Sequence, residues 1–168
     1  DRRQRQMCIR DSPNGAMYYF AKLIESKDIE SLERRLITTA YEDIGLANPN
    51  ACMRTVIAMQ AAKTIGFPEA RIPIASAIID LCLSPKSKSS ENAIDAALTS
   101  LNERSLKTPS YLRLTPVGLE DDEKYDYSRP ELWEYIQYLP KELGNTQFYV
   151  PWMTSNYEKA LAENYRRI

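Results

Sequence analysis

A chain of 168 residues is long enough to bury the core of one ordinary domain, and its 43% apolar and 27% charged residues are typical of a globular protein. Its 22 Lys and Arg against 23 Asp and Glu argue against binding nucleic acid through an overall basic excess. No apolar run approaches the roughly 20 residues of a membrane-spanning helix and no signal peptide is recognisable, so we expect no membrane contact. The cysteines Cys8, Cys52 and Cys82 are far apart and odd in number, which favours a reducing cytoplasm, and the last two fall in apolar patterns typical of a core.

The first twelve residues differ in character from the rest. The run from Met7 to Ser12 matches one reading frame of a common transposon-based sequencing adapter. We interpret residues 1–12 as a non-native leader derived from such an adapter, with native sequence beginning near Pro13. The alternative is a genuine basic leader. In either case the fold is predicted without these residues.

From residue 13 to residue 107 the capping and helix-breaking residues predict five helices. Capping side chains precede the first three of them: Ser12, Asp28 and Asn48. Prolines suited to a first helical turn follow two of these caps, at Pro13 and Pro49. Helix stops follow at Gly45, Gly66 and Pro85. The fourth helix is predicted over 69–83, and the fifth opens at Ser89 and Ser90.

Apolar residues recur at helical spacing along each predicted helix. The five stripes are Met17, Phe20, Ala21 and Ile24; Ile29, Leu32, Leu36 and Ala40; Ala51, Val56, Met59 and Ala62; Ile74, Ala75, Ile78, Ile79 and Cys82; and Ala93, Ile94, Ala97, Leu98 and Leu101. Short connections between such helices favour a bundle. We therefore predict an all-α fold in which about five main helices over 13–107 form one helical domain.

Residues 108–168 have a different composition. Prolines interrupt the helical period, and an acidic run at 120–123 reads as a solvated loop. A short helix is predicted over 130–137 and a terminal one over 155–167. The aromatic strip between them, which includes Tyr138, Phe148, Tyr149 and Trp152, is expected to bury rings against the bundle. We predict that 108–168 is a Pro- and aromatic-rich wrap with a C-terminal helix, packed on the same domain.

Residue types that carry chemistry are scarce. The chain has no histidine, which removes the commonest general base and metal ligand, and its five glycines do not form a phosphate-binding loop. We therefore expect no catalytic residue, cofactor or metal in this chain. Asp121 and Asp122 lie in the acidic run and are better explained as solvated charges than as metal ligands.

Two charged motifs have structural explanations. Glu42 and Asp43 are expected near a helix C-terminus, where the helix dipole disfavours negative charge, and Arg35 lies two turns earlier on the same face. A structural ion pair or a cap explains these three residues better than acid–base chemistry does. Lys86, directly after Pro85, is expected to cap the free carbonyls of the preceding helix rather than bind a phosphate.

Several short segments, in this order, resemble the region that follows the ATPase module in the RarA/MgsA family, whose eukaryotic relative is the Werner-helicase-interacting ATPase. They are PNGAMYY (13–19), RRL (34–36), EDIGLANP (42–49), GFPE (66–69), SPKS (84–87), QYLP (137–140) and FYVP (148–151). The resemblance covers nearly everything from residue 13 to residue 157. It marks as structural motif residues Arg35, Glu42, Asp43, Gly45, Pro49, Pro85 and Lys86. The chain departs from the family at Tyr111, where a histidine is usual, and over 119–127.

The resemblance implies a helical region related to the collar of clamp-loader ATPases that assembles its protein into homotetramers. It implies a cytoplasmic, nucleoid-associated bacterial protein that acts in replication restart, recombination and DNA repair. The whole protein is expected to hydrolyse ATP with Mg²⁺ and to bind DNA forks or ends and single-stranded-DNA-binding protein. Because the ATPase residues are absent from this chain, ATP and Mg²⁺ are expected only in the missing ATPase domain.

Two functions remain open for the chain itself. The first is a non-catalytic oligomerisation domain that forms tetramers. The second is a monomeric α-helical adaptor that binds a partner protein through aromatic anchors, since Tyr and Trp are enriched at such anchors. The interface candidates are Tyr18, Tyr19, Tyr138, Phe148, Tyr149 and Trp152.

Overall fold

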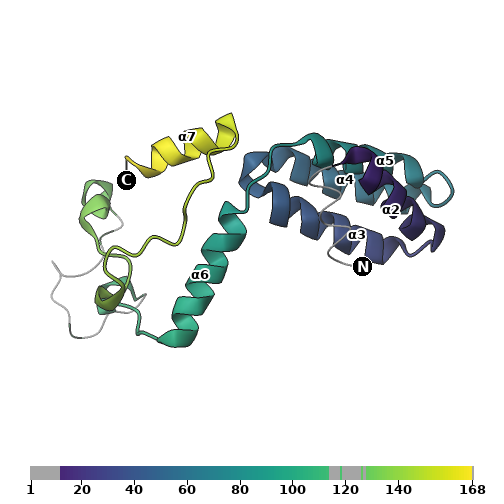
Figure 1. Cartoon of the computed structure of the whole chain (residues 1–168). Coiled ribbons are helices and arrows are strands. Elements are labelled where there is room, and N and C mark those ends of the chain that lie inside the picture. Colours follow the sequence, from purple (N-terminus) through teal and green to yellow (C-terminus); the bar gives the residue numbers. More distant parts are fainter. Residues whose placement is uncertain (1–11, 114–117, 119–125, 127, 168) are drawn as a thin grey trace. The chain divides into compact units, whose positions relative to one another are not determined.

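The computed structural model describes residues 12–113, 118, 126 and 128–167 (Figure 1). Its α-helices are α2 (Pro13–Glu25), α3 (Ile29–Thr39), α4 (Pro49–Ile65), α5 (Arg71–Leu83), α6 (Ser89–Glu103) and α7 (Asn156–Tyr165). No strand occurs in these described ranges, which confirms the predicted all-α class. Residues 1–11 of the predicted leader, and most of the divergent 119–127 segment, lie outside the described residues.

The chain divides into two compact units. One consists of residues up to 93 together with 149–167, and the other of residues 94–148. Helix α6 crosses the boundary between them. The predicted domain boundary at residue 107 stays a prediction, and each unit is described by itself below.

The predicted helix caps are confirmed. Ser12 Oγ accepts a hydrogen bond from Gly15 N at 3.1 Å, and Asn48 Oδ1 accepts one from Ala51 N at 3.2 Å. Asp28 Oδ1 accepts from Ser31 N at 3.0 Å. This hydrogen bonding to Ser31 lowers the pKa of Asp28, because it stabilises the charged carboxylate. Each cap satisfies an N–H group that has no partner inside its helix.

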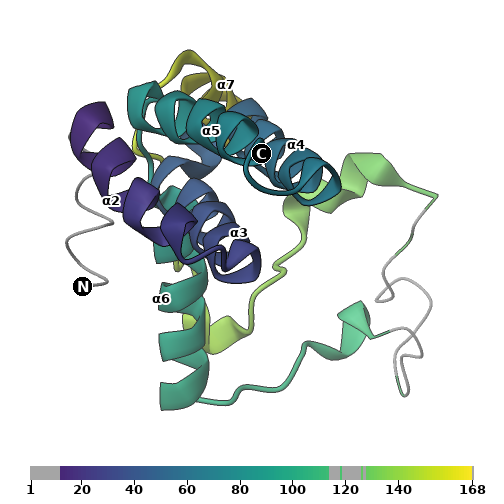
Figure 2. The same ribbon diagram turned by 90° about the vertical axis from the view of Figure 1, so that its right-hand side faces the viewer.

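Helices α2 to α5 enclose the hydrophobic core of the first unit. Helix α5 packs against both α2 and α4, and α4 also packs against α3, as Figure 2 shows. The largest fully buried apolar side chains are Phe20, Leu32, Leu36, Ile44, Met59, Ile74, Ile78 and Leu81. Cys52 and Cys82 are buried among them, as predicted, and burial raises the pKa of the Cys52 thiol.

The chain between α3 and α4 consists of two short helical turns of different type. Helix α3 ends at Thr39, a π turn follows over Ala40–Ile44, and a 3₁₀ turn spans Gly45–Ala47. Gly45 has a φ of +45°, and a Cβ there would lie 3.1 Å from Ser90 Oγ and 3.3 Å from the Ser87 carbonyl oxygen. Glycine is therefore required both by the backbone conformation and by the close approach of the 87–90 segment.

The C-terminal part of the chain contains shorter elements than predicted. A 3₁₀ helix forms over Pro130–Tyr135, and two single 3₁₀ turns form over Ser110–Leu112 and Lys141–Leu143. Helix α7 begins after Ser155, whose Oγ accepts from Glu158 N at 3.1 Å. It packs against the Gly45–Ala47 turn, which places α7 in the same unit as α2 to α5.

The stripe predicted on the fifth helix exists, but it is exposed. Ile94, Leu98 and Leu101 of α6 are each exposed by half or more, while Ala93 and Ala97 are half-buried. Helical spacing shows which face of a helix is apolar, and it does not show whether another element covers that face.

Candidate functional site

The acidic pair that follows α3 is neutralised by a lysine from a distant segment. Lys88 Nζ lies 2.7 Å from Glu91 Oε2 and 3.4 Å from both Glu42 Oε1 and Asp43 Oδ1. Burial disfavours the charge of Lys88, but the hydrogen bond to Glu91 and the charges of the other two carboxylates outweigh it, so the pKa of Lys88 is raised. The predicted compensation of the acidic pair therefore includes Lys88.

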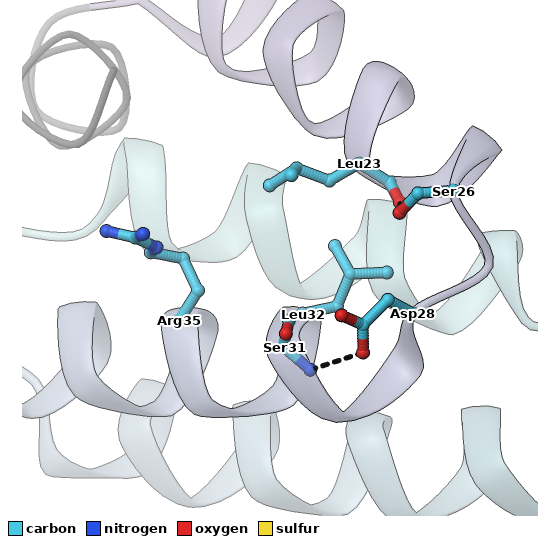
Figure 3. A pocket seen from close by; sticks show the side chains of 6 residues that line it. All are labelled: Leu23, Ser26, Asp28, Ser31, Leu32 and Arg35. Atoms are coloured by element: carbon cyan, nitrogen blue, oxygen red, sulfur yellow. Dashed lines mark hydrogen bonds between the residues drawn. The ribbon is translucent and has the colours of Figure 1, made fainter.

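Arg35 was the partner expected for Glu42. Its side chain lines a small pocket at the α2–α3 turn, with a volume of about 270 Å³ (Figure 3). The six lining residues are Leu23, Ser26, Asp28, Ser31, Leu32 and Arg35. The ion pair between Arg35 and Glu42 stays a prediction. The Asp28 carboxylate in this pocket caps α3.

Lys86 caps the C-terminus of α5, as predicted. Its Nζ donates to the carbonyl oxygens of Leu81 at 2.9 Å and Cys82 at 3.0 Å, and also to that of Ser84. The Leu81 carbonyl oxygen also accepts from Ser84 N at 3.3 Å. The ammonium group thus adds donors at a helix end, where few backbone N–H groups reach the last carbonyls. Pro85, which follows α5, prevents the helix from continuing.

A buried carboxylate that the sequence analysis did not single out joins α7 to the segment after α5. Glu158 is fully buried, and its Oε1 accepts hydrogen bonds from Ser87 Oγ at 2.9 Å and from Trp152 N at 3.2 Å. Thr154 Oγ1 donates to the Lys86 carbonyl oxygen at 2.6 Å. We call these contacts the Glu158 junction. The sequence pattern does not predict this junction, because an acidic residue in the first turn of a helix, such as Glu158, is usually explained by its favourable interaction with the helix dipole.

The junction leaves two polar atoms without a hydrogen-bond partner among the described residues, Glu158 Oε2 and the Tyr149 hydroxyl. Burial and then the charge of Glu158 raise the pKa of Tyr149. The Tyr149 ring meets Tyr165 of α7 edge to face, with ring centroids 5.7 Å apart. Tyr149 is therefore mainly a packing residue of the first unit.

The other interface candidates lie in different settings. Tyr18 is 60% exposed on α2, beside the half-buried Tyr19, with Lys22 Nζ 4.8 Å from the centre of the Tyr18 ring. Tyr138 and Trp152 are also exposed, whereas Phe148 is half-buried. These residues divide between the two units: Tyr18, Tyr19, Tyr149 and Trp152 belong to the first, and Tyr138 and Phe148 to the second.

A larger set of exposed apolar side chains lies on α4 and α5. We call it the outer face, and its members are Met53, Ile57, Ile65, Ile72, Ile79 and Leu83. Helical spacing predicted that Ile79 is buried in the core, and that prediction is wrong, because Ile79 is 44% exposed. The rest of α5 does turn Ile74, Ile78 and Cys82 inward as predicted.

In the ranges that the structure describes, no group of three or more Cys, Asp or Glu could hold a metal ion. No described helix is both long and apolar enough to span a bilayer. What the described surface offers is exposed apolar and aromatic side chains, which is typical of a helical interaction domain.

Sequence comparisons identify the family to which the chain belongs. Residues 11–168 match the family described as MgsA AAA+ ATPase C terminal, and the chain belongs to that family. It is 45% identical over 171 residues to replication-associated recombination protein A of Bacillus subtilis (strain 168), covering 97% of this chain and 41% of that protein. The Escherichia coli (strain K12) protein of the same name is 32% identical over 149 residues, covering 83% of this chain and 33% of that protein.

A eukaryotic protein is similar as well. The ATPase WRNIP1 of Dictyostelium discoideum is 27% identical over 145 residues, covering 81% of this chain and 17% of that protein. The resemblance to the RarA/MgsA family is thus confirmed. The chain spans less than half the length of each of these relatives.

Proposed function

We propose that this chain is the C-terminal oligomerisation domain of an AAA+ ATPase of replication-associated recombination, and that it assembles as a homotetramer. Membership of the MgsA C-terminal family supports the position of the domain in such an ATPase. The relatives named for replication-associated recombination support the process in which it acts. The proposed role of the domain is assembly, with no catalytic residue of its own.

One observation carries the assembly proposal. Large apolar side chains remain exposed at helical spacing on α4, α5 and α6, although helices α2 to α5 already enclose a well-filled core. A domain that works alone seldom leaves large contiguous apolar faces in water, because covering them is favourable by about 25 cal/mol per Å². Association of subunits covers such faces.

The remaining functions are assigned to the rest of the protein. ATP hydrolysis with Mg²⁺ belongs to the ATPase module that lies outside this chain. Contacts with DNA forks or ends and with single-stranded-DNA-binding protein are proposed for the assembled protein, in the bacterial cytoplasm near the nucleoid. The net charge of −1 on this chain supports placing the DNA contacts elsewhere.

The test is the molar mass of the 168-residue chain in solution, measured by light scattering over a concentration series. A mass near four times the 19.3 kDa of one chain, stable on dilution, is expected. A mass of one chain at every concentration would refute self-assembly by this domain.

The second candidate is a monomeric adaptor domain. It is favoured by one specific observation, the exposed Tyr18 ring under the Lys22 ammonium group, since an aromatic ring with a nearby cation can anchor a partner protein. A chain that stays monomeric, and that binds a partner through a surface sensitive to Tyr18→Ala, would support this candidate instead.

A further inference from the structure

Helices α4 and α5 are apolar on opposite sides. Their inner sides contribute Met59, Ile74, Ile78 and Leu81 to the core. Their outer sides carry the six exposed residues of the outer face, Met53, Ile57, Ile65, Ile72, Ile79 and Leu83. A helix that is apolar all round is normally covered all round. In the first unit these two helices are covered on one side only.

The exposed positions form regular stripes. On α5, Ile72, Ile79 and Leu83 are separated by seven and four residues, so they follow one side of the helix. On α4, Met53 and Ile57 are one turn apart, and both differ in direction from the buried Met59. Figure 2 shows α4 and α5 running side by side, so that their stripes belong to one two-helix layer.

An ion pair joins the two helices on this side. Arg54 Nε lies 2.7 Å from Asp80 Oδ2, and Arg54 Nη2 lies 3.0 Å from Asp80 Oδ1, in a two-pronged contact that is partly exposed. Ile57 follows Arg54 by three residues, and Ile79 and Leu83 are next to Asp80 and one turn beyond it. The pair therefore sits among the apolar side chains of the outer face.

The charged pair that lies among the outer-face residues is neutral, although the two helices together carry more cations than anions. Helices α4 and α5 carry four charged side chains between them: Arg54, Lys63, Arg71 and Asp80. Lys63 forms an ion pair with Glu33 of α3, and Arg71 donates to the Pro68 carbonyl oxygen at 2.6 Å. Arg54 and Asp80 neutralise each other. At the outer face itself, a nucleic acid or a strongly charged peptide would therefore meet the neutral Arg54–Asp80 pair and not a net charge of opposite sign.

We propose that the outer face binds the outer face of a second copy of this chain, about a two-fold axis. A surface that meets itself must be self-complementary, and this one offers apolar stripes together with one cation and one anion that can exchange partners between copies. Two such two-helix layers, packed face to face, form a four-helix arrangement with a shared apolar interior. This inference rests on the proposed oligomerisation and names the surface that performs it.

The test places charges of either sign at Ile57, which is 62% exposed and so tolerates them in the folded subunit. Ile57→Glu and Ile57→Lys are each measured by light scattering, with far-UV circular dichroism as the check on folding. Each variant alone is expected to fall to half the mass of the unchanged chain or less, because like charges meet across the two-fold axis. The matched control is Thr99→Glu, an exposed polar residue of α6 outside the apolar stripes, which is expected to retain the mass.

Mixing the two Ile57 variants in equal amounts then tests whether the face meets itself. Opposite charges face each other only in a contact between two outer faces, so the mixture is expected to regain the mass of the unchanged chain. Full mass in Ile57→Glu alone, or no recovery in the mixture, would overturn the inference while self-assembly itself stands. A monomeric unchanged chain would instead refute the proposed function on which the inference depends.

Discussion

Ser87 Oγ donates a 2.9 Å hydrogen bond to Glu158 Oε1, and it joins residues 71 positions apart in the chain. The bond attaches α7 to the segment that follows α5, in the same unit as the core helices. Because both residues are fully buried, the geometry of this contact is set by the fold and not by solvent.

Removing Glu158 is expected to destabilise the first unit. Glu158→Ala leaves the Trp152 N–H without its acceptor and removes one of the two acceptors of the Ser87 hydroxyl, the other being Ser89 Oγ, at a cost of about 1–3 kcal/mol. Glu158→Gln keeps one acceptor oxygen and is expected to cost less. The measurement is the urea midpoint, with Glu163→Ala on the exposed side of α7 as the matched control. Equal midpoints for Glu158→Ala and the control would contradict the structural role of the junction.

Ser87→Ala tests whether the same bond couples the two residues. In a double-mutant cycle with Glu158→Ala, the two effects are expected to be non-additive by about 1 kcal/mol or more, because both substitutions remove one shared hydrogen bond. Strict additivity would mean that the two residues contribute independently. Native-state hydrogen exchange of the α7 amides is expected to quicken in both single variants.

Lys86→Ala is expected to destabilise the C-terminus of α5. The substitution leaves the Leu81 and Cys82 carbonyls without the ammonium donor that now caps them, at about 1–2 kcal/mol. Lys107→Ala removes the same charge from an exposed position and serves as the control, with an expected change below about 0.5 kcal/mol. Thermal unfolding of both variants at one pH measures the difference.

Substituting two glycines by alanine can distinguish the cost of a positive φ from the cost of a steric clash at the added Cβ. Gly45→Ala is expected to cost about 2–3 kcal/mol, since it combines a φ of +45° with a Cβ 3.1 Å from Ser90 Oγ. Gly144 has a similar φ of +47°, but its nearest neighbour would lie 4.0 Å from the added Cβ. Gly144→Ala should therefore show the conformational cost alone, about 1–2 kcal/mol. A smaller loss at Gly45 than at Gly144 would refute the close approach of the 87–90 segment.

The contacts of Lys88 with Glu42, Asp43 and Glu91 make the free energy of unfolding depend on pH in the alkaline range. The folded pKa of Lys88 lies above the usual 10.5, so the folded state holds its proton more tightly than the unfolded chain does. This contribution is complete below the unfolded pKa and is lost as pH rises through the folded pKa. Urea midpoints from about pH 8 to pH 12 should fall less steeply in Lys88→Met than in the unchanged chain. Tyr149, whose pKa is raised, titrates in the same window, so Tyr149→Phe is measured alongside.

Local sequence signals predicted much of the fold, because they depend on residues near in the chain. The caps at Ser12, Asp28 and Asn48 and the stop at Pro85 were predicted correctly, since each acts within one turn of its own helix. The buried cysteines and most of the apolar stripes followed from helical period alone. The cap formed by Lys86 was predictable for the same reason, because its acceptors lie four and five residues away.

Only the tertiary structure decided which apolar faces are covered and which distant charges meet. Helical spacing predicted that Ile78 and Ile79 are both buried, but consecutive residues lie about 100° apart around a helix. Only the positions of α2 and α4 decide that Ile78 is buried and Ile79 is exposed. Lys88 and Glu158 find partners more than forty residues away, and no spacing rule reaches that far. Sequence alone thus determined the helices, their caps and the family, because these are local or motif-level properties. The outer face and the Glu158 junction arise from packing between elements distant in the chain, so they could be recognised only in the folded unit.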